Sequence, residues 1–153
     1  PVPRRFPEMN YGKSLRVLRD GRVEPDTVPE DSSLVIRTDE GLVVLTGCGH
    51  AGAVNIVTAA RAIAGPMPIA ALIGGLHLFT ATRPTVDWTA DQLKAVGVAH
   101  LLSGHCTGLE PTRRLADVLG LGTDRAAYGA VGATYELGKG IDARPIARGI
   151  APG

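Results

Sequence analysis

The sequence predicts an α/β fold in which a β-hairpin is followed by βαβα units, forming one mixed sheet with flanking helices. Short apolar runs bounded by turn residues alternate with longer segments in which apolar residues recur at helical spacing. Three of these runs lead into a glycine-containing cassette with a histidine, at His50, His77 and His105. The histidines are 27 and 28 residues apart, about the length of one βαβ crossover, so they should follow successive parallel strands.

The N-terminal part of the chain predicts strands and one hairpin. Residues 15–18, 33–37 and 41–46 are short apolar runs of the kind that form strands. Asp39 and Glu40, followed by a glycine, supply a tight turn between the last two runs, which predicts an antiparallel hairpin.

The segment 51–64 predicts a mostly buried helix. Asn55, Thr58 and Arg61 are three residues apart and form one polar stripe, while apolar residues cover the rest of the helix. A glycine and a proline at positions 65 and 66 end it. The rest of the chain predicts, in order, a strand at 69–73, a helix from Pro84 to Gly97, a strand at 98–102, a helix with Pro111 in its first turn and Gly120 at its end, and strands near 126–128 and 133–137.

The length and composition predict one domain with two terminal extensions. At 153 residues the chain is long enough to bury about 70% of its unfolded surface. Residues 1–13, rich in proline and polar groups, are expected to form a connecting arm, and residues 14–138 the domain itself. Residues 139–153 contain glycines, prolines and few large apolar side chains, so we expect a flexible tail.

The composition also excludes several classes of partner. The net charge is +1 and aromatic residues make up 4%, which does not favour nucleic-acid binding. The longest apolar stretch, 65–79, is interrupted by prolines, glycines and a histidine, so no membrane span is predicted. No signal-peptide pattern opens the chain, and we expect a cytoplasmic protein. The two cysteines are expected to be reduced, although a disulfide would be feasible if their strand ends are adjacent.

The three histidine cassettes predict a metal site. Ligands of open α/β sheets bind at the carboxyl edge of the strands, where His50, His77 and His105 should converge, and three imidazoles suit a divalent metal. The alternative is that they are ordinary core or loop histidines. His100 lies inside a strand-like run without a glycine cassette, so we assign it a structural role.

Four residues beside the histidines are further candidates. Cys48 and Cys106 would be soft metal ligands if the site is rebuilt, although buried packing would also explain them. Thr107 and Gly108 stand before the third helix and would offer a hydroxyl and a backbone N–H to an anionic substrate. Turn geometry explains these last two equally well.

Several cassettes together resemble a known family. The segments GLVVLTGCGHAGAVNIV, IGGLHL, SGHCTG and YGAVGATYELG occur in order and resemble the C-terminal half of the metallo-β-lactamase superfamily. Within it they are most similar to the dihydropterin-ribofuranosyl-aminobenzene-phosphate synthase-like branch. The resemblance extends from about Val2 to about Gly138. It implies half of an αββα sandwich, in which two similar halves enclose the metal site.

The resemblance also implies roles for the histidines. His50 corresponds to the lone histidine that joins the first metal, and His105 to the last histidine, which joins the second. His77 lies where the superfamily usually keeps a metal-bridging aspartate, so the number of ions is open. The implied cofactor is a divalent metal, most simply zinc, with iron and manganese as alternatives.

The family's first metal motif, HxHxDH, is absent from this sequence. A catalytic zinc needs three protein ligands and an open position, so the resemblance implies that this chain alone completes neither site. We therefore expect an oligomer: either a pair with a separate N-terminal half bearing HxHxDH, or a homodimer. Burial of a standard-size apolar interface is worth on the order of 10–13 kcal/mol, too much for the inner face of the sheet to stay uncovered.

Two functions of different classes follow from these observations. The first is a metal-dependent hydrolase in which this chain supplies half of a one- or two-metal site that activates water. Its substrate would be a small molecule, phosphorylated if the branch name applies. The second is a non-catalytic half-domain, kept for assembly or metal binding or left as a truncated remnant.

Overall fold

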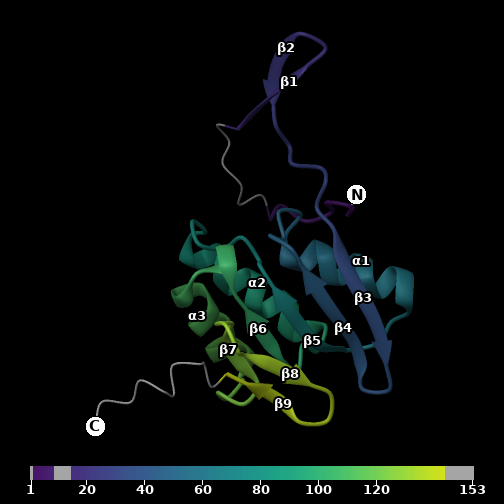
Figure 1. The fold of residues 1–153 in the computed structure, drawn as a ribbon, viewed down its shortest axis with the longest axis vertical. Helices are drawn as coiled ribbons and strands as arrows, with labels where there is room; N and C mark the ends of the chain where they lie inside the picture. The colour runs from purple at the N-terminus through teal and green to yellow at the C-terminus, as the bar shows by residue number, and fades with distance from the viewer. Residues whose placement is uncertain (1, 9–14, 144–153) are drawn as a thin grey trace.

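A five-stranded mixed sheet forms the centre of the fold (Figure 1). The computed structural model describes residues 2–8 and 15–143. Along the sheet the strands are β3 (Ser33–Thr38), β4 (Gly41–Thr46), β5 (Ile69–Gly74), β6 (Leu101–Ser103) and β7 (Ala126–Tyr128).

The pairing of these strands matches the predicted topology. Strands β3 and β4 are antiparallel and joined by the predicted turn, while β4, β5, β6 and β7 are all parallel. Strand β6 begins later than the predicted 98–102, because Val98 makes only an isolated bridge to Ile69. The predicted mixed sheet with flanking helices is confirmed.

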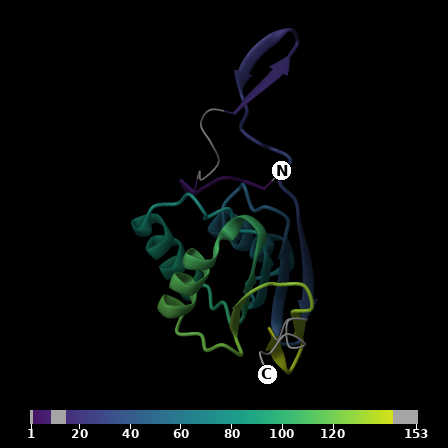
Figure 2. The same cartoon turned by 60° about the vertical axis from the view of Figure 1, so that its left-hand side comes forward.

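Three helices of the described chain pack on one face of the sheet (Figure 2). They are α1 (Ala53–Ala64), α2 (Arg83–Ala95) and α3 (Leu109–Leu119). Helix α1 begins two residues after the predicted start, because Gly52 has a φ of 95°, outside the helical region. None of the helices in the described ranges is long and apolar enough to span a bilayer.

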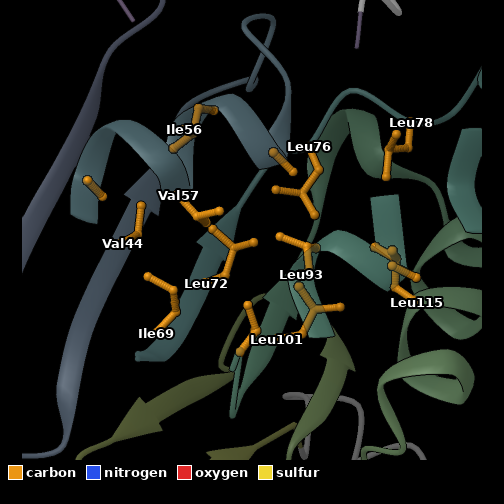
Figure 3. Packing of buried hydrophobic residues seen from close by; sticks show 14 of the residues in the cluster. Val44, Ile56, Val57, Ile69, Leu72, Leu76, Leu78, Leu93, Leu101 and Leu115 are labelled. Carbon is orange, nitrogen blue, oxygen red and sulfur yellow. The ribbon is translucent and has the colours of Figure 1, made fainter. Parts of the chain in front are cut away.

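The core lies between these helices and the sheet (Figure 3). One row of inward-facing residues follows the register across four strands: Val35, Val44, Leu72 and Leu101. The last three of these are fully buried against all three helices. Alternation along each strand sends the neighbouring residues to the opposite face.

The second face of the sheet carries another apolar row with less cover. Leu34, Leu45, Ile73 and Leu102 are register partners across β3, β4, β5 and β6. Leu34 is 59% exposed, whereas Leu102 is buried, and Tyr135 packs with Leu45 and Ile73 against the buried residues of this face. This helix-free face is the one that the sequence led us to expect at an interface.

Two hairpins lie outside the main sheet. The first, β1 (Arg16–Arg19) with β2 (Arg22–Pro25), extends away from the body of the domain (Figure 1). The second pairs β8 (Thr134–Glu136) with β9 (Gly140–Asp142). Strands β2 and β9 were not predicted, and β9 lies in the segment expected to be a flexible tail, where the buried side chain of Ile141 orders it. The rest of that segment, 144–153, lies outside the described residues.

The predicted arm is attached to the domain through helix α1. The Asn55 side-chain oxygen accepts hydrogen bonds from the backbone N–H groups of Arg5 and Phe6, at 2.7 and 2.9 Å. Glu8 is buried, and its carboxylate accepts a 2.9 Å hydrogen bond from the backbone N–H of Asn55 in the first turn of α1. Residues 2–8 are therefore a packed part of the domain, and residues 9–13 of the arm lie outside the described ranges.

His100 has the structural surroundings predicted for it. Its Nδ1 lies 2.9 Å from the carbonyl oxygen of Ala70, and its ring lies 5.2 Å from that of Tyr135. The first contact joins the segment before β6 to β5, and the second joins it to the β8–β9 hairpin. The other three histidines lie at the opposite, carboxyl ends of β4, β5 and β6.

Candidate metal centre

The three cassettes lie at one edge of the sheet, as the spacing predicts. His50 follows β4, His77 follows β5, and His105 follows β6. Since these strands are adjacent and parallel, their carboxyl ends bring the three loops together. The sequence interval of 27 and 28 residues thus corresponds to one strand–helix–strand repeat each time.

His50 and His77 form a contacting pair. Their ring centroids are 4.5 Å apart in an edge-to-face arrangement, and the His77 ring also contacts that of Phe79, with centroids 5.3 Å apart. His77 has a φ of 49°, a left-handed conformation that is uncommon for a residue with a side chain. Its Nδ1 atom is buried and has no hydrogen-bond partner among the described residues. A buried imidazole nitrogen without a partner is a candidate metal ligand.

The surroundings of His77 favour the neutral form of its imidazole. Burial is the largest cause that lowers the pKa of His77, followed by the neighbouring His50 and His105; the Asp31 carboxylate acts in the opposite direction. A neutral imidazole keeps a lone pair free for a cation. The chemistry of this donor set therefore fits a divalent metal.

His105 points into a different group of side chains. Its Nδ1 lies 3.6 Å from the sulfur of Cys48, and the Cys106 thiol donates to the carbonyl of Cys48 at 3.1 Å. Burial is the main cause that raises the pKa of Cys106. Both cysteines are free, and the ligand atoms of Cys48, His105 and Cys106 all lie within 4.8 Å of one another.

The structure thus divides the predicted three-histidine site into two neighbouring groups. Within residues 2–8 and 15–143, Cys48, His105 and Cys106 bring three possible ligand atoms close enough to share one metal ion. Neither His50 nor His77 belongs to this group. The reason is local: His105 has a φ of 54° and opens the short turn His105–Thr107, which directs its ring toward Cys48. The spacing of the histidines in the sequence does not reveal the direction in which the His105 ring points.

Close backbone packing holds the three loops together. The N–H of Gly75 donates to the carbonyl of Gly47 at 2.9 Å, and the N–H of Gly104 donates to that of Gly74 at 3.1 Å. The hydroxyl of Thr46 donates to the carbonyl of Gly75 at 2.7 Å. A side chain at position 75 would meet the Gly47 carbonyl oxygen at 2.5 Å, so glycine is required there.

Gly75→Ala is therefore expected to lower the free energy of unfolding by about 1–3 kcal/mol, because a backbone carbonyl blocks the new methyl group. Gly47→Ala in the adjacent loop is the matched control, since a methyl group there has no atom within 4 Å. Urea denaturation of both variants measures the difference. Equal stability of the two variants would contradict the tight packing of these loops.

The two predicted substrate contacts have different surroundings. Thr107 is fully buried, and its hydroxyl accepts a 2.9 Å hydrogen bond from the backbone N–H of Leu76. This hydroxyl connects the loops of His77 and His105, and its predicted role as a substrate ligand stays a prediction. Gly108 precedes α3 with a φ of 85°, and its role toward substrate stays a prediction.

Sequence reasoning missed two residues that support the site. Asp31 accepts a 2.8 Å hydrogen bond from the backbone N–H of Ala51, directly after His50. The Tyr128 hydroxyl donates to the carbonyl of His105 at 3.1 Å. Neither residue stands in a cassette, and each reaches the site only because the fold brings β7 and the segment before β3 to it.

A hollow of about 300 Å³ lies beside His105. It is lined by the ends of β4, β5 and β6, mostly by small residues together with Ile73 and Leu102, and by Gly129, Ala130 and Ala133 of the loop before β8. Small side chains leave room here for a ligand next to the imidazole.

The chain was compared with family profiles, curated proteins and solved structures. No known family profile matches the chain. A curated relative, the 7,8-dihydropterin-6-methyl-4-(β-D-ribofuranosyl)-aminobenzene-5′-phosphate synthase of Methanocaldococcus jannaschii, is 39% identical over 96 residues, which cover 63% of this chain and 33% of that protein. The crystal structure of a metal-dependent hydrolase of the β-lactamase superfamily aligns with a TM-score of 0.61 and 32% identity, covering 68% of this chain and 40% of that one.

The chain has a metallo-β-lactamase-like fold. The similarity to the hydrolase structure confirms the resemblance to the superfamily, and the similarity to the synthase confirms the resemblance to the predicted branch. This metallo-β-lactamase-like chain spans about one third of the length of the curated relative and two fifths of the solved structure. The residues described here are therefore the counterpart of only part of those proteins.

Proposed function

We propose that this chain supplies half of the metal site of a hydrolase, in which His50, His77 and His105 bind one or two divalent ions together with ligands from outside the chain. The observation that carries the proposal is the contacting pair His50–His77, in which the buried Nδ1 of His77 has no hydrogen-bond partner among residues 2–8 and 15–143. The similarity to a metal-dependent hydrolase supports it. Zinc is the expected ion, because imidazole nitrogens suit it, with iron and manganese as alternatives.

A divalent ion at this edge would lower the pKa of a water molecule and polarise a phosphoryl or carbonyl oxygen of the substrate. The residues of this chain would orient the metal ligands and position the substrate. The rings of Phe79 and His50 both pack against the ring of His77, and Asp31 fixes the backbone next to His50. The hollow beside His105 would receive a small substrate, for which we propose a phosphorylated molecule, in line with the phosphate in the name of the curated relative.

The remaining ligands must come from a second polypeptide segment. The curated relative is about three times as long as the matched region, and HxHxDH is absent from this chain. The helix-free face, with its row Leu34, Leu45, Ile73 and Leu102, is the surface on which such a segment would pack. We propose an N-terminal half bearing HxHxDH as the partner, and a homodimer through the same face is the alternative that the oligomeric mass distinguishes.

Native mass spectrometry of the purified protein tests this proposal first, because it reports the oligomeric mass and the bound metal together. Hydrolysis of chromogenic phosphoesters and cyclic amides is then measured for the chain alone and with an HxHxDH-bearing half. His50→Ala and His77→Ala are each expected to lower kcat/KM by more than the about 10–100-fold typical of losing an outer-shell partner.

His100→Asn is the matched control, because His100 lies on the hairpin side of the sheet and contacts Ala70 and Tyr135 instead. Its activity should equal that of the wild type. A metal-free protein that gains no activity with the partner half, or full activity in both site variants, would refute the hydrolase and favour the non-catalytic half-domain.

A further inference from the structure

We propose that Cys48, His105 and Cys106 form a binding site for one thiophilic divalent cation, typified by Zn²⁺, that is complete within a single chain. Two of the ligands come from the His105 turn and one from the loop after β4, so the site joins the ends of β4 and β6. This inference goes beyond the proposed hydrolase, because it needs neither His50 and His77 nor a second polypeptide; His105 is the one ligand that the two proposed sites share.

The distances match the geometry of zinc. Zn–S bonds of about 2.3 Å and Zn–N bonds of about 2.0–2.1 Å in a tetrahedron place the sulfur and nitrogen about 3.5 Å apart. The Cys48 sulfur and the His105 Nδ1 are 3.6 Å apart, and every pair in the group of three lies within 4.8 Å. Small side-chain rotations therefore bring the Cys106 sulfur to the same cation.

The donor set selects the class of cation. Thiolate and imidazole ligands favour Zn²⁺ and similar thiophilic ions over Mg²⁺ or Ca²⁺, which prefer oxygen. The cysteines bind as thiolates, so two thiol protons pass to the solvent for each cation bound. Two cysteines and one histidine, with a fourth position open, are also one of the ligand sets found at catalytic zinc.

The surroundings leave that fourth position accessible. His105 is exposed, and the hollow of about 300 Å³ borders it, so water or a substrate anion can reach a cation bound there. Cys48 and Cys106 are only partly buried. The site thus resembles an open metal site more than a closed structural one.

The backbone of the turn is already set for this arrangement. His105 has the left-handed φ of 54°, and the Tyr128 hydroxyl holds its carbonyl at 3.1 Å. The N–H of Phe79 donates to the carbonyl of Cys106 at 3.2 Å, and the N–H of Leu76 donates to the Thr107 hydroxyl. Backbone strain of this kind persists where the surrounding contacts hold it in place and is frequent at ligand sites.

Titration of the reduced, metal-free full chain with Co²⁺ tests the proposal, because cobalt bound to thiolate absorbs through sulfur-to-metal charge transfer. We expect one Co²⁺ per chain, with this absorption and the visible bands of a tetrahedral ion, and displacement by Zn²⁺. Cys48→Ser, Cys106→Ser and His105→Asn should each weaken binding by more than about 100-fold, beyond the range for outer-shell partners.

Two controls separate this site from the hydrolase. His100→Asn should bind as the wild type does, and His50→Asn should abolish hydrolysis while the cobalt–thiolate absorption is kept. As a second readout that needs no variant, Zn²⁺ should protect both thiols of the wild type from alkylation. Absence of thiolate-to-cobalt absorption in the wild type, equal alkylation with and without Zn²⁺, or an unchanged spectrum in a folded Cys106→Ser protein would overturn the proposal.

Discussion

Leu72→Ala is expected to lower the free energy of unfolding by about 2–5 kcal/mol. Leu72 lies in the central part of β5, is fully buried, and is the register partner of Val44 on one side and Leu101 on the other (Figure 3). Truncation removes apolar contacts and leaves a cavity between the sheet and the helices, which the packed neighbours fill only in part.

Chemical denaturation followed by circular dichroism measures this loss. Leu18→Ala is the matched control: it removes the same atoms from a side chain that is 71% exposed on the β1–β2 hairpin, and should change stability by less than about 0.5 kcal/mol. A loss of similar size in both variants would show that β5 is not the centre of the core.

Glu8→Gln is expected to raise stability above pH 7 and to remove a pH dependence that the wild-type protein has. Burial raises the pKa of Glu8 from 4.5 to about 7, although the backbone N–H groups of Val54 and Asn55 act to lower it. One oxygen of this carboxyl and the hydroxyl of Thr89 are buried without a hydrogen-bond partner in the described part of the chain. The amide of glutamine carries no charge and can donate as well as accept.

The direction of the pH effect follows from proton linkage. The native state holds the Glu8 proton up to about pH 7, whereas the unfolded state releases it near pH 4.5. The stability that the protonated Glu8 contributes is therefore fully present below pH 4.5 and is lost as the pH rises through 7. The total loss in the free energy of unfolding is roughly 3 kcal/mol at most. Above pH 7 the buried charge is the cost that the glutamine variant avoids.

Urea denaturation between pH 4 and 8.5 tests this expectation. Wild-type stability should fall across this range by more than that of Glu8→Gln. Glu30→Gln serves as the control, because this exposed side chain lies on the loop before β3 and its loss should leave the wild-type profile unchanged. Parallel profiles for wild type and Glu8→Gln would show that the Glu8 charge is not buried in the native state.

Two arrangements at the same sheet edge have different consequences for function. The His50–His77 pair requires further ligands to hold a catalytic ion, which connects it to a partner that covers the helix-free face. The set of Cys48, His105 and Cys106 has three ligand atoms within one chain. Metal stoichiometry of the chain with and without a partner half therefore distinguishes the two sites.

Much of the fold was predictable because local patterns carry it. Apolar runs bounded by turn residues located the five strands of the main sheet, and the Asp39–Glu40 turn predicted the antiparallel pairing of β3 with β4. Strands β2 and β9 were missed, because they are short, polar and paired only within their own hairpins. Such strands depend on a neighbour more than on their own composition.

The candidate site was predictable in its location and less so in its detail. Equal spacing of the cassettes along βαβ repeats determined by itself that His50, His77 and His105 lie at one edge of a parallel sheet. Only the tertiary structure decided that His105 turns to Cys48, that the Thr107 hydroxyl is buried, and that Asp31 supports the loop of His50. The physical reason is that periodicity determines where each strand ends, whereas the direction of a side chain depends on left-handed backbone angles and on contacts between loops far apart in the sequence.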